Sequence, residues 1–173
     1  MTIRPRSMAI AAAAAVLVGT VWLLHRSPAR TPEERIQALF QEAARAAEQR
    51  KVGEVVEILS ERFEGGGEGS RATRDDVRRL LVAELLRGQW VSVTISAAPV
   101  IVDGPRARAT VDAVLSRAAD RSKGLASLLP GEASVHRFRL DLEEEGGKWR
   151  VVSGQWRQVG IEEALSGPDA PHW

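Results

Sequence analysis

The sequence predicts an α+β domain over residues 31–160, with an N-terminal segment before it and a C-terminal tail, residues 161–173, after it. Two observations lead to this prediction. Before Gly88, apolar residues recur at spacings of three and four, as in helices, whereas from Trp90 they alternate with polar residues, as in strands. Helices that precede a run of strands indicate about three helices packed on an antiparallel sheet of about four strands.

Residues 1–30 are expected to be a signal anchor. Within them, residues 8–24 are 17 consecutive residues without a charge, and Arg4 and Arg6 precede this run. A helix of that length covers about 25 Å, close to the ~30 Å hydrocarbon core of a lipid bilayer. We therefore expect a single-pass membrane protein, with the domain on the extracytoplasmic (periplasmic) side because the N-terminal tail is short.

The same segment is also typical of a signal peptide, because it is short and rich in alanine. Ser27 and Ala29 supply the small residues that a cleavage site needs, so secretion after cleavage is the alternative. Pro28 and Arg30 flank that site and favour the uncleaved anchor. The excess of arginine over lysine suggests a bacterial protein.

A capping box is expected to start the first helix, with Thr31 as the N-cap, Pro32 at the first helical position and Glu34 two residues later. The apolar face of this helix, which runs to about Arg50, consists of Ile36, Leu39, Phe40, Ala43 and Ala47. After Gly53, a second and shorter helix is expected, with an apolar face of Val55, Val56, Leu59 and Phe63.

Residues 65–70, with the sequence GGGEGS, are expected to form an exposed loop. No Lys-Ser or Lys-Thr pair follows these glycines, so the segment is not a phosphate-binding loop. A second capping box, Thr73 with Asp76, predicts the start of the third helix, which ends at Gly88. The apolar face of this helix consists of Val77, Leu80, Leu81 and Leu85.

The first two strands are expected at residues 91–97 and 107–115, and they form an antiparallel hairpin. A loop over residues 117–132 separates them from a third strand at residues 133–144. The last strand covers residues 148–159.

The third strand carries one apolar and one charged face. His136 shares its apolar face with three other residues: Phe138, Leu140 and Leu142. On the opposite face, basic and acidic residues predict cross-strand charge pairs exposed to solvent. This charged face extends over the second and third strands. Its residues are Arg106, Arg108 and Asp112 of the second strand, and Arg137, Arg139, Asp141 and Glu143 of the third. In the last strand, Trp149 and Trp156 share a face only if a bulge lies near Gly154.

Three stretches of the sequence resemble the nuclear transport factor 2-like superfamily (SnoaL-like or cystatin-like cone). They are the first helix with its follower, the entry into the sheet (LLVAELLRGQWVSVTI) and the closing hairpin (HRFRLDLEEEGGKWRVVSGQW). The resemblance covers about three quarters of the chain and implies helices packed into a curved sheet. It implies little about function, because this superfamily contains isomerases, dehydratases, transport adaptors and non-catalytic domains. Its steroid isomerase-like and scytalone dehydratase-like members rely on tyrosine, and this chain has none.

His136 is the one histidine expected inside the domain, since His25 is juxtamembrane and His172 lies in the tail. As a general base it would need a carboxylate, for which Asp112 and Glu84 are the candidates. A neutral, hydrogen-bonded histidine of the core or its rim is the favoured interpretation.

Composition excludes several classes of function. The chain has no cysteine, which excludes disulfides, thiol catalysis and thiolate metal sites. No histidine or carboxylate spacing indicates a metal, and no motif indicates a cofactor. Four of the 24 basic residues precede residue 31, so 20 remain against all 23 acidic residues, which argues against nucleic-acid binding.

The leading hypothesis is a membrane-tethered, non-catalytic domain that binds an envelope protein or forms a homodimer through its sheet face. The alternative is a domain of the same fold that binds a small apolar ligand, or performs acid/base chemistry, in a pocket with His136.

Overall fold

The computed structural model describes residues 30–67, 69–86, 92–116 and 133–167. The expected membrane segment, residues 8–24, lies outside these residues, and so does the predicted loop at residues 117–132. Within the described part of the chain, no helix is long and apolar enough to cross a membrane.

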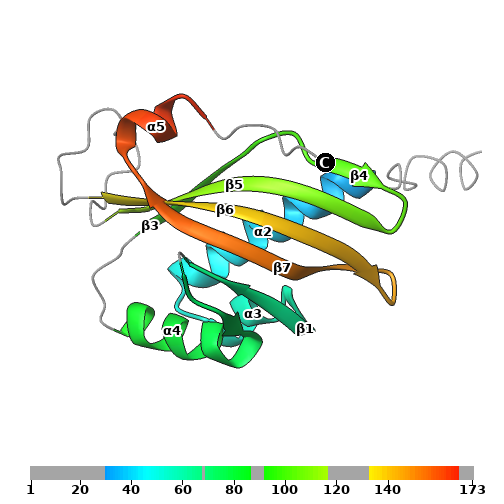
Figure 1. Cartoon of the computed structure of the whole chain (residues 1–173), viewed down its shortest axis with the longest axis horizontal. Helices are drawn as coiled ribbons and strands as arrows, with labels where there is room; N and C mark the ends of the chain where they lie inside the picture. The colour runs from blue at the N-terminus through cyan, green and yellow to red at the C-terminus, as the bar shows by residue number, and fades with distance from the viewer. Residues whose placement is uncertain (1–29, 68, 87–91, 117–132, 168–173) are drawn as a thin grey trace, which may run out of the picture. The chain divides into compact units, whose positions relative to one another are not determined.

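The described residues form seven strands of one sheet, in the order β2-β1-β7-β6-β5-β3, with β4 also paired to β5 (Figure 1). All pairs are antiparallel except β1 with β7, which run parallel. The prediction of about four strands was therefore wrong: the four predicted strands are present as β3, β5, β6 and β7, and three further strands, β1, β2 and β4, join them. The strands are β1 (Leu59–Gly66), β2 (Ala72–Thr73), β3 (Ser92–Ala97), β4 (Ile101–Asp103), β5 (Arg106–Ser116), β6 (Ala133–Glu145) and β7 (Lys148–Val159).

The described residues form four helices, one more than the sequence predicts. They are α2 (Pro32–Glu48), α3 (Val52–Val56), α4 (Arg74–Leu86) and α5 (Ile161–Leu165). Helix α2 starts where the sequence predicts. The second predicted capping box is also confirmed, because the backbone N–H of Thr73 donates to Asp76 Oδ2 at 2.9 Å and that of Asp76 donates to Thr73 Oγ1 at 3.3 Å. Leu80, expected on the apolar face of α4, is 52% exposed.

Strand β1 replaces the end of the predicted second helix and the start of the predicted glycine loop. Leu59 and Phe63 are four residues apart, which fits a helix, yet α3 ends at Val56 and both residues lie in β1. Gly65 also lies in β1, opposite Gly154 of β7. A Cβ atom on Gly65 would lie 2.2 Å from the Gly154 carbonyl oxygen, so glycine allows β1 to approach β7.

The core lies between α2 and one face of the sheet. Helix α2 contributes Ile36 and Phe40, which are 0% and 4% exposed, and Figure 1 shows this helix behind strands β5 to β7. Each such side chain stabilises the fold by roughly 1.5–3 kcal/mol when fully buried. The sheet and β1 supply the remaining core residues: Phe63, Ala107, Ala109, Val111, Leu142, Trp149 and Val151.

A bulge in β7 brings both of its tryptophans to the core face. Leu142 pairs with Val151 and Asp141 with Ser153, so Val152 is the extra residue. Trp149 is buried in the core, and Trp156 packs against it beside Phe138, with 6.5 Å between the ring centroids. Of the two alternatives that the sequence leaves open for these tryptophans, the structure has the bulge, two residues before Gly154.

Candidate functional site: an arginine groove on the outer sheet face

The charged residues of β5 and β6 lie on the sheet face opposite α2, which we call the outer face. In this register Asp112 of β5 is directly opposite Arg137 of β6, and Arg137 is opposite Arg157 of β7. The three residues form a row across the strands. Because side chains opposite each other on one face of a sheet are in contact range, the row brings two guanidinium groups and a carboxylate together.

Arg137 and Asp112 form a buried, two-pronged ion pair. Arg137 Nε donates to Asp112 Oδ1 at 2.7 Å and Nη2 donates to Oδ2 at 2.8 Å. The two side chains are 6% and 2% exposed. The sequence predicts that this charged face is exposed to solvent, and for the pair of Arg137 and Asp112 this prediction is wrong. The two parallel hydrogen bonds offset part of the free-energy cost of removing both charges from water.

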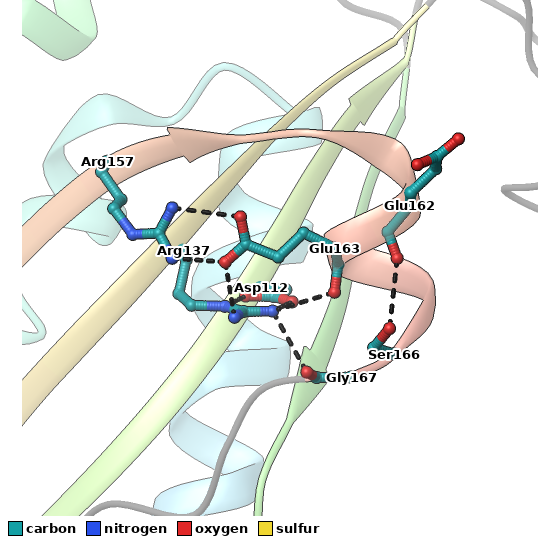
Figure 2. Close-up of polar contacts among 7 residues, drawn as sticks. All are labelled: Asp112, Arg137, Arg157, Glu162, Glu163, Ser166 and Gly167. Carbon is teal, nitrogen blue, oxygen red and sulfur yellow. Dashed lines mark hydrogen bonds and ion pairs between the residues drawn. The ribbon is translucent and has the colours of Figure 1, made fainter.

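Helix α5 completes this cluster, and the sequence does not predict it, since residues 161–165 are expected to belong to a tail. Arg137 Nη2 also donates to the backbone carbonyls of Glu163 and Gly167, at 3.4 and 3.2 Å. The helix therefore lies over the buried pair, as Figure 2 shows.

Glu163 of α5 joins two arginines of the row. Its Oε1 accepts from Arg137 Nη1 at 3.0 Å and from Arg157 Nη2, and its Oε2 accepts from Arg157 Nη1 at 3.2 Å. The hydrogen bonds from Arg157 lower the pKa of this carboxyl, and the charges of both arginines add to the effect. Glu163 is thus an ionised carboxylate between two guanidinium groups.

Among the other charged residues of the outer face, Arg106, Arg139 and Asp141 are exposed, as predicted, whereas Arg108 and Glu143 are partly buried. Arg108 donates to Asp141 at 3.1 Å, and Arg106 lies 3.5 Å from Glu143. Arg62 of β1 also contacts Glu143 and donates to Glu145 at 3.2 Å. These partly exposed pairs position the side chains but contribute little to stability.

A groove of about 1040 Å³ runs along β7, between the β1–β2 hairpin and the outer-face side chains of β6. Residues 152–157 of β7 line it continuously, and glycines of residues 65–69 line its opposite wall. Arginines outnumber acidic residues in its lining, so we call it the arginine groove. Its charged residues are Arg62, Arg71, Arg137, Arg139, Arg157, Glu64 and Glu143.

Two of these arginines are available for a ligand. Arg71 and Arg139 are exposed, and no carboxylate among the described residues forms an ion pair with either. Arg139 lies opposite Gln155 and one diagonal step from Arg157 on the same face. A diagonal step of this kind is within reach of long side chains. The groove therefore holds the side chains of Arg139 and Arg157 as diagonal neighbours on one face of the sheet.

Of the three residues proposed for acid/base chemistry, Asp112 is separated from His136 by the sheet, whereas Glu84 is near enough for its charge to act on His136. His136 is half-buried on the core face, opposite Ala113, with its Nε2 at 3.2 Å from Ser134 Oγ. Asp112 lies on the outer face with Arg137. Burial lowers the pKa of His136, although the charge of Glu84, on exposed helix α4, raises it. Among the described residues, no three metal-binding side chains are grouped.

Solved structures with the same arrangement of helices and strands exist. A nuclear transport factor 2-like protein of unknown function from Shewanella oneidensis superposes with a TM-score of 0.59 at 11% identity, over 73% of this chain and 98% of that one. A ketosteroid isomerase-like protein from Erwinia carotovora atroseptica superposes with a TM-score of 0.57 at 10% identity, over 76% of this chain and 99% of that one.

A candidate scytalone dehydratase from Novosphingobium aromaticivorans gives a TM-score of 0.54 at 15% identity, over 73% of this chain and 83% of that one. At such identities the likeness shows the fold and not the activity. No protein-family model matches the chain, and no curated protein does.

Proposed function

We propose that this chain is a membrane-tethered, non-catalytic binding domain. Its fold is similar to that of nuclear transport factor 2-like proteins, and this fold occurs in enzymes and in non-catalytic domains alike. Its ligand is an acidic segment of a protein partner, held in the arginine groove. The observation that carries the proposal is the pair of exposed arginines, Arg71 and Arg139, that line the groove without a carboxylate partner among the described residues.

Guanidinium groups favour a carboxylate ligand. Arginine presents a rigid fork of N–H donors that matches the two oxygens of a carboxylate, and it stays charged at all physiological pH values. Arg157 already binds a carboxylate in this way, because its two terminal nitrogens donate to the two carboxylate oxygens of Glu163. The size and the open length of the groove suit an extended peptide, whose backbone can approach the glycine wall closely.

Two observations support a non-catalytic role. Among the described residues that line the arginine groove, none is a histidine or a cysteine, so neither of these common bases and nucleophiles faces the ligand. On the other face, the space between α2 and the sheet is packed with core side chains, and the hydrogen-bond partner of His136 there is a serine hydroxyl.

Binding of a synthetic hexaglutamate peptide to the full chain in detergent, measured by calorimetry at low salt, tests this proposal. Arg139→Gln is expected to weaken binding about tenfold, or about 1.4 kcal/mol. Arg45→Gln removes the same charge from an exposed position on α2, outside the groove, and is expected to leave the affinity within about twofold. No binding to the wild-type chain, or equal losses in the two variants, would refute the proposed site.

The membrane tether is the second part of the proposal. Residues 8–24 form the apolar segment, and α2 begins at Pro32, so residues 25–31 are a short linker. We propose that the domain meets its partner beside the extracytoplasmic surface of the bilayer. The intact mass of the protein extracted from membranes checks this: a chain that retains residues 1–30 is expected, whereas a chain that starts at Arg30 and is found in the soluble fraction would show secretion after cleavage.

A further inference from the structure

Helix α5 is attached to the sheet by polar contacts. It has five residues, none of them buried, and its Leu165 is 55% exposed. Its hydrogen bonds with the sheet involve the Glu163 carboxylate and the Glu163 carbonyl, and the carbonyl of Gly167, just after the helix, also accepts from Arg137. An exposed helix this short has little intrinsic stability in water, so its position depends on these contacts.

Arg137 does not need Glu163 to stay neutralised. Its Nε and Nη2 atoms donate to the Asp112 carboxylate, and its Nη1 atom donates to Glu163 (Figure 2), so Asp112 already accepts two hydrogen bonds from it. Departure of Glu163 would therefore not leave a buried charge without a partner, which is the costly outcome for a buried ion pair. Departure of Glu163 would also end its two hydrogen bonds with Arg157, whose side chain is 41% exposed and lines the groove.

From this geometry we propose, on the basis of the proposed function, that Arg137 and Arg157 form the carboxylate-binding subsite of the arginine groove. Glu163 occupies this subsite in the free chain, and an acidic residue of the partner peptide replaces it. Both arginines line the groove, and Arg139 lies on the same face beside them. A peptide carboxylate in the subsite thus makes the contacts that Glu163 makes now, while the next acidic residue reaches Arg139.

The test compares two neighbouring carboxylates of α5 in the full chain. Glu163→Gln removes the competing charge, and hexaglutamate binding is expected to tighten about fivefold. Glu162→Gln removes the same charge from the same helix, where no ion pair of Glu162 is present among the described residues, and the affinity is expected to stay within about twofold. Arg157→Gln is expected to weaken binding at least tenfold, with or without Glu163.

A second measurement follows α5 itself. The backbone N–H groups of Ala164 and Gly167 are hydrogen-bonded within the α5 turn, to Gly160 and Ala164. If the peptide displaces the helix, hydrogen exchange at these two amides accelerates when hexaglutamate is added to the wild-type chain. Unchanged exchange at saturating peptide would overturn the replacement of Glu163.

The outcomes separate this inference from the proposed function. Peptide binding that depends on Arg139 but is unaffected by Glu163→Gln would leave the groove as the binding site and overturn the subsite. Equal tightening by Glu163→Gln and Glu162→Gln would also overturn it, because a general charge effect would explain both. A complete lack of binding in all variants would refute the proposed function and this inference with it.

Discussion

Two aspartate–arginine pairs of the outer face differ in burial and therefore in their effect on stability. Asp112 and Arg137 are almost completely buried, whereas the side chains of Asp141 and Arg108 are 51% and 34% exposed. Both pairs join β5 to β6 directly across the strands. They are thus a matched comparison of the same contact in two environments.

Replacing Asp112 by alanine is expected to lower the free energy of unfolding by about 3–5 kcal/mol, because it leaves Arg137 as a buried charge without its main partner. Asp141→Ala is expected to cost less than about 1 kcal/mol, since its partner stays hydrated. Urea unfolding of the full chain measures both. Equal losses would contradict the burial of the Asp112 pair.

His136 is expected to make stability depend on pH. Burial lowers its pKa in the folded chain, more than the charge of Glu84 raises it. The unfolded chain therefore takes up the proton at a higher pH than the folded chain does, so the free energy of unfolding falls as the pH drops below about 6.5, the ordinary value for histidine. The loss ends once the pH is below the pKa in the folded chain.

Unfolding measured between pH 7.5 and pH 5 in wild type and in His136→Gln checks this effect, since glutamine does not titrate. The wild-type slope is expected to be the steeper of the two. Identical slopes would show that the pKa of His136 is the same in the folded and unfolded chains.

At the scale of elements, β1 and β7 are in close backbone contact at two glycines. Gly65 and Gly154 face each other there, and Phe63 and Leu140 fill the space around Gly154. This contact places the β1–β2 hairpin along β7 and thereby forms one wall of the arginine groove. The glycines that the sequence analysis interpreted as a loop are thus part of the sheet.

Gly65→Ala is expected to destabilise the chain by about 1–3 kcal/mol, because the added methyl group would overlap the Gly154 carbonyl and Phe63. A Cβ atom added at Gly53 of α3 would have no neighbouring atom within 4 Å. Gly53→Ala is therefore expected to raise the free energy of unfolding by up to about 1 kcal/mol, because alanine has the higher helix propensity. Thermal unfolding distinguishes the two. Destabilisation by both substitutions to the same extent would contradict the close β1–β7 contact.

At the scale of the whole molecule, the parts that local patterns determine were predicted correctly. The capping box of Thr73 and Asp76, the change of period after Trp90 and the closing hairpin all follow from neighbouring residues, and so does the α+β class. Strand β1 was missed because its parallel pairing with β7 joins residues about 90 positions apart, and only the glycine contacts reveal it.

The candidate site was predicted only in part. Alternation along β5 and β6 correctly placed Asp112 and Arg137 on one face, which already separated Asp112 from His136. Their burial could not be foreseen, because it depends on α5, a five-residue helix without an apolar stripe. The arginine groove also requires β1 beside β7, so the same missed pairing concealed it.

The most direct test of the arginine groove as the binding site is the location of the peptide on the domain. In a nuclear magnetic resonance titration of the full chain with hexaglutamate, chemical-shift changes are expected to concentrate on groove residues, among them Ser70, Arg71, Arg139 and Gln155. Changes concentrated around His136 on the core face, with the groove unaffected, would contradict it.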